Sequence, residues 1–180
     1  KEAVNWLGSS VSKREQTKTV DEVYAKSLFN LALAHSRRGD FKKMEASILK
    51  SLDAKKSMYG GNSPRLLDGY SALTGACISL KDYSRAIEYG NKALDLIGDD
   101  RDEHINELAI LYVNIGISHA FMSDYAKAVM FLERAEALYR TSSLPRDENY
   151  INLLNSLASN YHFLGQREKS EQYFNKGFSL

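Results

Sequence analysis

Apolar residues recur along this chain three and four positions apart, which is the spacing of one face of an α-helix. The helical pattern is itself repeated. Four short segments that each open a predicted helix, at 39–41, 81–83, 123–125 and 165–167, follow one another at intervals of 42 residues (81 − 39 = 42, 123 − 81 = 42, 165 − 123 = 42). A fixed interval of this size indicates an array of helical repeats.

The apolar spacing predicts nine helices and no strand. We expect them at 1–14, 20–38, 41–58, 66–80, 83–97, 102–122, 125–140, 146–164 and 167 to near the end. Thr19 and Glu22 have the spacing of a capping box at the start of the second helix. Gly39 can end that helix in a left-handed conformation, Asp40 can cap the next, and Ser63 before Pro64 marks a further start.

Several side chains are expected to face the core. In the first helix they are Ala3, Val4, Leu7 and Val11, with Trp6 on an apolar packing position; in the second they are Val23, Leu28, Leu31 and Ala32. Lys42, Lys43, Lys55 and Lys56 are expected on solvated helix faces, and His104 is expected to face solvent near a helix start.

Equivalent positions in the four units carry a common set of residues. The first helix of each unit has a large residue (Leu28, Tyr70, Tyr112, Leu154), then a branched residue three positions on (Leu31, Leu73, Ile115, Leu157), then a small one (Ala32, Thr74, Gly116, Ala158). The second helix begins at an aromatic residue (Phe41, Tyr83, Tyr125) or Arg167 and then has Met44, Ala86, Ala128 or Ser170, and later Ser51, Ala93, Ala135 or Gly177.

This pattern resembles the tetratricopeptide repeat (TPR) family, and the 42-residue period resembles its kinesin-light-chain-like type. The turn Gly60-Gly61-Asn62-Ser63-Pro64 is similar to the Gly-x-x-x-Pro element of that type, and similar long repeats occur in bacterial regulators that sense peptides. The resemblance implies an all-α fold, a right-handed α-α superhelix of antiparallel helix pairs. We expect one array over 1–180: a second helix of a truncated repeat at 1–14, and repeats at 19–60, 61–101, 102–144 and 145–180.

Composition and charge narrow the range of partners. The net charge is +1, and the three successive 60-residue segments carry 12 basic against 7 acidic residues, 5 against 9, and 7 against 7. This is far from the basic surface of a nucleic-acid-binding protein, so we expect no nucleic-acid partner. No apolar run reaches the ~18–20 residues of a membrane span. Cys77 is the single cysteine, which fits a reducing compartment, and the start at Lys1 suggests a fragment of a longer protein.

Candidate catalytic and metal-binding residues are few. His35, Cys77 and His119 occupy one equivalent position in three successive repeats, but packed helices lie about 8–10 Å apart, too far for three ligands within ~2.3 Å of one ion. The acidic pairs Asp99-Asp100 and Asp102-Glu103 lie where a helix N-terminus favours negative charge. We expect no metal, no cofactor and no enzymatic activity within these residues.

The TPR resemblance implies that the first helix of each repeat lines a concave groove that binds a peptide or partner segment. Carried over position by position, the groove residues are Phe29, Asn30, Leu33, Arg37, Ser71, Ala72, Gly75, Ile110, Val113, Asn114, Ile117, Phe121, Asn155, Ser156, Ser159 and His162. Asn30 and Asn114 occupy the position at which related proteins bind a ligand backbone through an amide. A carboxylate clamp would need basic residues, and only Arg37 is nearby.

Three functions remain open from the sequence. A non-catalytic protein–protein interaction scaffold that binds a peptide in the groove is the leading hypothesis. The chain could instead be a ligand- or peptide-sensing regulatory domain of a signalling or transcription protein. A third reading is self-association through uncapped ends, because Phe174, Phe178 and Leu180 form an apolar stripe on the last helix. A fourth reading, in which the groove side chains simply pack against each other, predicts no ligand.

Overall fold

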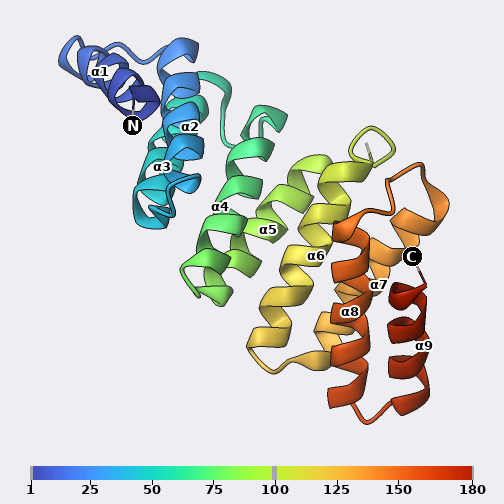
Figure 1. Ribbon diagram of the computed structural model, residues 1–180. Helices are drawn as coiled ribbons and strands as arrows, with labels where there is room; N and C mark the ends of the chain where they lie inside the picture. The colour runs from blue at the N-terminus through green and yellow to red at the C-terminus, as the bar shows by residue number, and fades with distance from the viewer. Residues whose placement is uncertain (1, 99–100, 180) are drawn as a thin grey trace. The chain divides into compact units, whose positions relative to one another are not determined.

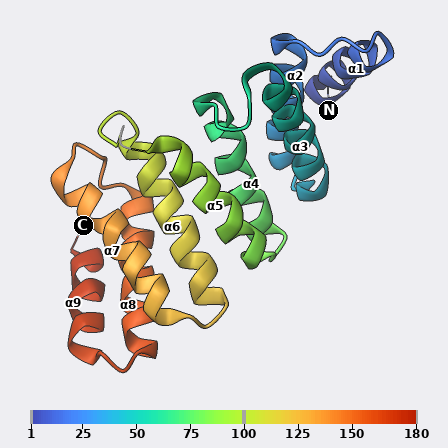
Figure 2. The same ribbon diagram turned by 180° about the vertical axis from the view of Figure 1, so that it is seen from behind.

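A computed structural model describes residues 2–98 and 101–179, apart from the side chains of Glu2 and Ala3. The chain divides into two compact units, Lys1–Asp82 and Tyr83–Leu180, which we describe separately. Every regular element among the described residues is helical (Figures 1 and 2). The predicted Asp99-Asp100 pair, the side chain of Ala3 and the whole of Leu180 lie outside the described residues.

The first unit contains α1 (Glu2–Gln16), α2 (Glu22–Ser36), α3 (Phe41–Tyr59), the single 3-10 turn η1 (Pro64–Leu66) and α4 (Leu67–Ser79). The second contains α5 (Tyr83–Ile97), α6 (Ile105–Phe121), α7 (Tyr125–Thr141), α8 (Glu148–Phe163) and α9 (Arg167–Phe178). Within each unit, helices adjacent in sequence pack against each other: α2 on α3, α6 on α7 and α8 on α9 form helix pairs joined by short turns. The all-α, helix-pair repeat fold expected from the sequence is confirmed.

The 42-residue period is visible in the backbone of the turns. The residue two positions before the second helix of each repeat has a left-handed φ: 73° at Gly39, 61° at Lys81, 62° at Ser123 and 72° at Gly165. In each case the next amide donates a hydrogen bond to the carbonyl five residues earlier, at N–O distances of 3.0, 2.8, 2.9 and 2.9 Å. These bonds satisfy carbonyl groups that the helix end leaves open, so every repeat turns the chain in the same way.

Small residues determine how closely the two helices of a repeat approach. In the second unit, Gly116 of α6 faces α7, and a Cβ built on it would lie 2.8 Å from Leu132 Cγ and 3.1 Å from the Ala128 carbonyl oxygen. In the first unit, the buried Ser51 of α3 donates a 2.7 Å hydrogen bond to the Ala25 carbonyl of α2. These contacts explain why the repeat pattern requires small residues at these positions.

The start of α2 differs from the prediction. Asp21, not Thr19, is the N-cap: its carboxylate accepts a 2.7 Å hydrogen bond from the Tyr24 amide, while the Thr19 hydroxyl pairs with that of Thr17. The capping box is therefore wrong, because an extended aspartate nearer the helix supplies the acceptor. At α3, Asp40 is the N-cap as predicted, but its side chain makes no capping hydrogen bond.

Besides α2, which begins at Glu22 rather than 20, two helices begin two or three residues later than the spacing predicts. α6 begins at Ile105 rather than 102, after a turn in which the His104 amide donates to the Arg101 carbonyl at 3.2 Å. α8 begins at Glu148 rather than 146, because the extended Asp147 accepts a 2.9 Å hydrogen bond from the Asn149 amide. His104 itself is half-buried rather than solvent-facing.

Some predicted core residues are exposed and one predicted surface residue is largely covered. Trp6 is 73% exposed, because α1 packs on α2 through the neighbouring stripe that ends in the buried Val11. Val23 is also exposed, because Ala25 and Leu28 form the inward face of α2. Lys55, expected in solvent, is largely covered: its ammonium lies 2.7 Å from Asp68 and joins α3 to α4.

Candidate functional site

The predicted groove residues of the first unit lie on α2 and α4. Asn30, Leu33 and Arg37 are exposed, whereas Phe29, Ser71, Ala72 and Gly75 are half-buried. The Lys55 ammonium lies 5.6 Å from the centre of the Phe29 ring, so α3 already covers part of that ring. A backbone carbonyl and the Asp68 carboxylate hold the ammonium in this place.

The predicted groove residues of the second unit lie on α6 and α8, which run side by side (Figures 1 and 2). The structure brings five of them together, Ile117, Phe121, Asn155, Ser156 and Ser159, in one groove of about 760 Å³. Val113 and Asn114 are half-buried and Ile110 is exposed farther along α6. The exposed His162 lines a smaller depression of about 350 Å³, which shares Ser159 and Phe163 with this groove and also includes Phe174 of α9.

The two walls of this space, which we call the α6–α8 groove, differ in chemistry. The α6 wall is apolar, formed by Ile117, Ala120 and Phe121. The α8 wall is mostly amide and hydroxyl, and its apolar end is Phe163. The complete lining is Ile117, Ala120, Phe121, Ser123, Tyr125, Asn152, Asn155, Ser156, Ser159, Asn160 and Phe163. No side chain in this lining carries a formal charge.

Sequence reasoning missed six of the lining residues, and the repeat period could have found three. Phe163 lies 42 residues after Phe121, and Asn152 lies 42 residues after Ile110. Ala120 lies 42 residues before His162, and all three reference residues were assigned to the predicted groove. Asn160 lacked such a signal, since buried positions are assigned to the core by pattern. Ser123 lies in the turn before α7 and Tyr125 is the first residue of that helix, whose approach to α8 depends on the three-dimensional packing.

Two aromatic stacks support the phenylalanines at the C-terminal ends of α6 and α8. Tyr83 of α5 stacks on Phe121 with ring centres 4.7 Å apart and planes 5° apart. Tyr125 of α7 stacks on Phe163 at the same 4.7 Å, with planes 14° apart. The two phenylalanines are nevertheless 64% and 62% exposed, so each presents a supported aromatic surface to solvent.

Hydrogen bonds within α8 arrange its polar wall. Ser156 and Ser159 donate to the carbonyls of Asn152 and Asn155 at 2.8 and 2.9 Å. The Asn160 amide nitrogen donates to the Ser156 carbonyl at 2.7 Å, but its buried Oδ1 accepts no hydrogen bond within the described residues. The side-chain amides of Asn152 and Asn155 are exposed and can each offer donors and an acceptor to a ligand.

A histidine and an ion pair lie next to the groove, at the turn between α6 and α7. His119 Nδ1 lies 3.5 Å from Asp124, and Lys127 Nζ lies 3.1 Å from the same carboxylate. Burial lowers the pKa of His119, an effect that the charge of Asp124 partly opposes. The hydrogen bond from Lys127 lowers the pKa of Asp124, so this carboxylate stays charged and engaged with its neighbours.

A second polar cluster joins α7, α8 and α9 away from the groove. The largely buried Glu136 accepts a 2.6 Å hydrogen bond from Lys176, and the Tyr150 hydroxyl donates to the same carboxylate at 3.4 Å. Tyr161 donates to Glu133, and burial followed by this bond raises the pKa of Tyr161 far above its usual value. Each member has a partner inside the protein, so the cluster stabilises helix packing rather than offering a reactive group.

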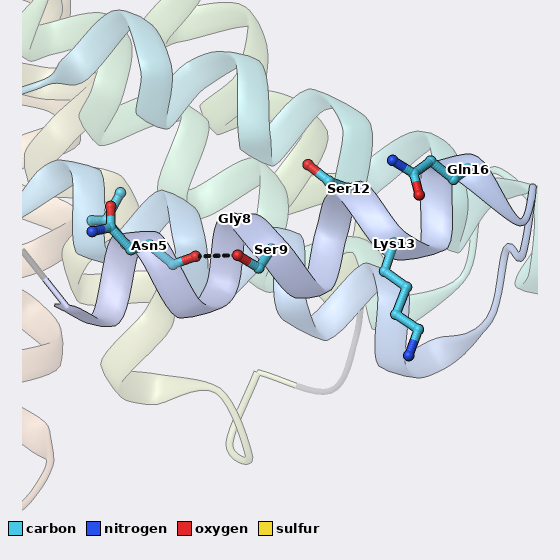
Figure 3. Close-up of a pocket in the computed structure, with 7 residues that line it drawn as sticks. Asn5, Gly8, Ser9, Ser12, Lys13 and Gln16 are labelled. Carbon is cyan, nitrogen blue, oxygen red and sulfur yellow. Dashed lines mark hydrogen bonds between the residues drawn. The ribbon is translucent and has the colours of Figure 1, made fainter.

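A third depression, of about 590 Å³, lies along α1. Figure 3 shows Asn5, Gly8, Ser9, Ser12, Lys13 and Gln16 along one helix, with the Ser9 hydroxyl donating to the Asn5 carbonyl at 3.0 Å. All its lining residues come from this helix, so no second element forms an opposing wall.

The described residues offer no metal site or membrane span. Among them, no three His, Cys, Asp or Glu side chains are grouped in a way that could hold an ion. Cys77 is buried, and its equivalents His35 and His119 are each near an aspartate, Asp40 and Asp124. Over residues 2–98 and 101–179, no helix combines the length and the apolar character that crossing a bilayer requires.

Comparison with solved structures shows the fold. The chain is similar to a Podosopora anserina kinesin light chain with nearly identical TPR-like repeats. The two chains are 18% identical in sequence, the alignment covers 99% of this chain and 84% of that one, and the TM-score is 0.80. It is similar to BtubC (BKLC) from P. vanneervenii, with 18% identity over 96% of this chain and 69% of that one and a TM-score of 0.83. A Rap protein complexed with Competence and Sporulation Factor matches at 18% identity and TM-score 0.69, over 98% of this chain and 47% of its own length.

A search among curated protein sequences found no match. The model of the tetratricopeptide repeat family, however, matches residues 23–97 and 107–180. The matched ranges cover most of the chain and include α3 to α5 and α7 to α9 entirely. Proteins built from such repeats generally serve as protein–protein interaction scaffolds. The family match, the helix pairs and the repeated turns together show that this chain belongs to the tetratricopeptide repeat family.

Proposed function

We propose that this chain is a non-catalytic interaction module that binds a peptide or partner segment along the first helices of its repeats. The observation that carries the proposal is the α6–α8 groove, where five predicted first-helix residues meet and where Phe121 and Phe163 are each supported by a stacked tyrosine. Its volume lies within the ~300–1,000 Å³ of typical ligand pockets. One wall can bury apolar side chains and the other can hydrogen-bond a peptide backbone.

The similar proteins are consistent with this use. The solved Rap protein has a bound factor, and the name of the Podosopora anserina protein places it with kinesin light chains. At 18% identity these likenesses support the shared fold, and the choice of partner depends on the side chains of this chain.

The experiment is a selection of binding peptides from a random displayed library, followed by calorimetry of a synthesised hit. Ser159 is exposed on the α8 wall, and Ser159→Trp would fill the groove without changing a buried residue. Met130 is exposed on α7 outside the lining, so Met130→Trp is the matched control. We expect the first variant to lose the peptide and the second to keep it. Equal binding to both variants would place the site elsewhere.

The predicted groove asparagine of each unit is tested by its own variant, Asn30→Ala in α2 and Asn114→Ala in α6. A ligand that contacts α2 would bind more weakly to the first variant, and a ligand that contacts α6 would bind more weakly to the second, because each variant loses an amide that can contact a backbone. A loss confined to Asn114→Ala would restrict the site to the second unit.

Self-association is a second candidate, supported by three exposed aromatic side chains, Trp6, Phe174 and Phe178. Light scattering over a hundredfold range of concentration tests it, since a constant monomer mass would exclude association through them. A sensory role in a larger protein would instead appear as a ligand-dependent change of dimensions in small-angle scattering.

A further inference from the structure

We propose that the α6–α8 groove is a subsite for one large uncharged side chain, aromatic or long aliphatic, of an extended partner peptide, and that it discriminates against acidic and basic side chains. This inference rests on the proposed function and adds the chemical class of the residue that the partner inserts. Four features of the groove support it: the absence of charged side chains from the lining, the stacked rings of Phe121 and Phe163, the amide side chains of α8, and the unpaired Oδ1 of Asn160.

The lack of charge excludes a charged anchor. The eleven lining residues are apolar, hydroxyl or amide. The Asp124 carboxylate, between Ser123 and Tyr125 in the sequence, already contacts Lys127 at 3.1 Å and His119 at 3.5 Å, and it caps α7 through the Lys127 amide at 3.3 Å. A carboxylate or ammonium group entering the groove would lose water without gaining an opposite charge, which is unfavourable.

The supported rings favour an apolar anchor. Phe121 and Phe163 stand at equivalent positions of successive repeats, and each is stacked on a tyrosine from the preceding second helix. Because the stacks already restrict both rings, a ligand that packs on them has less side-chain freedom to remove on binding. Two exposed phenylalanines that face the same groove also leave apolar surface in water, and a bound side chain would cover it.

The amide wall determines what flanks the anchor. Asn152 and Asn155 are exposed, and each amide has two donors and one acceptor oxygen with which to pair with the N–H and C=O groups of an extended backbone. Such pairing holds the backbone but does not read side chains. Specificity in this subsite therefore comes from the apolar wall, which consists of Ile117, Ala120 and the phenylalanines.

Asn160 provides an independent sign of a missing partner. Its side chain is 5% exposed and belongs to the lining, and its nitrogen is fixed by the Ser156 carbonyl at 2.7 Å. The remaining Oδ1 is buried with no hydrogen-bond donor among the described residues. A buried acceptor without a donor is unfavourable, and a small shift of α8 side chains on binding would let a peptide N–H or an indole N–H reach it.

The test uses the complete 180-residue chain and four small probes: the N-acetyl amides of tryptophan, leucine, glutamate and lysine. Each is titrated into isotope-labelled protein and followed through backbone amide NMR shifts. We expect the tryptophan and leucine probes to shift amides of residues 117–125 and 152–163 with saturation, and the charged probes to bind at least tenfold more weakly. Phe121→Ala should weaken the tryptophan probe about two- to twelvefold, the range that one aromatic contact contributes.

Phe178→Ala is the matched control, because Phe178 is an exposed phenylalanine outside the lining, and its affinity for the probe should be unchanged. Asn160→Leu keeps the volume and removes the acceptor, and it should weaken the tryptophan probe more than the leucine probe. Equal affinity for charged and uncharged probes, shifts located outside both segments, or an unchanged affinity of Phe121→Ala would overturn the proposal.

The two proposals fail separately. If the selected peptides lose binding to Ser159→Trp but are enriched in acidic or basic anchor residues, this inference is wrong and the proposed function stands. If the tryptophan probe binds with saturation but the selected peptides bind Ser159→Trp as well as the native chain, the subsite stands and the proposed function is wrong.

Discussion

Gly116→Ala is the most direct test of how the repeats pack. Gly116 is in the interior of α6, where replacing glycine by alanine ordinarily stabilises a helix by about 1 kcal/mol. The added Cβ would lie 2.8 Å from Leu132 Cγ, 3.0 Å from its Cδ2 and 3.1 Å from the Ala128 carbonyl oxygen. Leu132 and Ala128 are fully buried, and a backbone carbonyl of α7 cannot rotate away as a flexible side chain can.

Overpacking a core by one methyl group costs about 1–3 kcal/mol. Set against the helix gain of about 1 kcal/mol, the net effect of Gly116→Ala is a loss of up to about 2 kcal/mol. Gly75 of α4 is the matched control, because it is also inside a helix and a Cβ there would meet no atom within 4 Å. Gly75→Ala should therefore be stabilising by about 0.5–1 kcal/mol.

Urea unfolding followed by circular dichroism compares the two variants with the native chain. We expect the midpoint of Gly116→Ala to fall and that of Gly75→Ala to rise. If Gly116→Ala were as stable as Gly75→Ala, α6 and α7 would not be as close as described, and the account of the small-residue position would be wrong.

Three further predictions concern stability. Ala128→Leu and Ala86→Leu place larger side chains at fully buried positions and should each cost about 1–3 kcal/mol, so an unchanged melting temperature for both would contradict the repeat register. Asp21→Ala should lose about 0.5–2 kcal/mol in urea unfolding, whereas Thr19→Ala should be neutral; the reverse order would restore the capping box. Burial lowers the pKa of His119 in the folded chain, so on acidification the unfolded chain binds a proton at this residue first, and stability that is present above about pH 6.5 is lost as the pH falls. His119→Gln should therefore have a smaller decrease in melting temperature between pH 7.5 and pH 5 than the native chain. An equal decrease in both proteins would exclude His119 as the cause.

The sequence predicted the helices and the turns well because the repeat multiplies each local signal. The left-handed residue before each second helix is glycine at 39 and 165 but lysine at 81 and serine at 123, so composition alone would miss half of these turns. The 42-residue interval places them all. Helix starts were less accurate, since Asp21 and Asp147 compete with nearby capping residues that pattern alone ranks equally.

Side-chain burial was predicted less well where a helix has few neighbours. Trp6 and Val23 are apolar and fit a helical stripe, but the stripe on each helix is wider than the surface that the neighbouring helix covers. Lys55 shows the opposite case, because its long side chain crosses to Asp68 and to the Phe29 ring of another helix.

The sequence assigned several residues to a groove, but the contacts that give the α6–α8 groove its chemical character could be described only from the structure. Ile117, Phe121, Asn155, Ser156 and Ser159 were all assigned to a groove through the family resemblance, and the structure brings them together between α6 and α8. The stacks of Tyr83 and Tyr125, and the unsatisfied oxygen of Asn160, arise from contacts between residues 38 positions or more apart or from burial. A single sequence contains no local signal for either.

The most direct test of the central claim is amide hydrogen exchange of the chain with and without a peptide selected from the displayed library. Binding in the α6–α8 groove predicts slower exchange in residues 117–125 and 152–163, with little change in the middle of α7 around Met130. Protection confined to α7 and α9, or to α1, would contradict the claim and place the partner on a different surface.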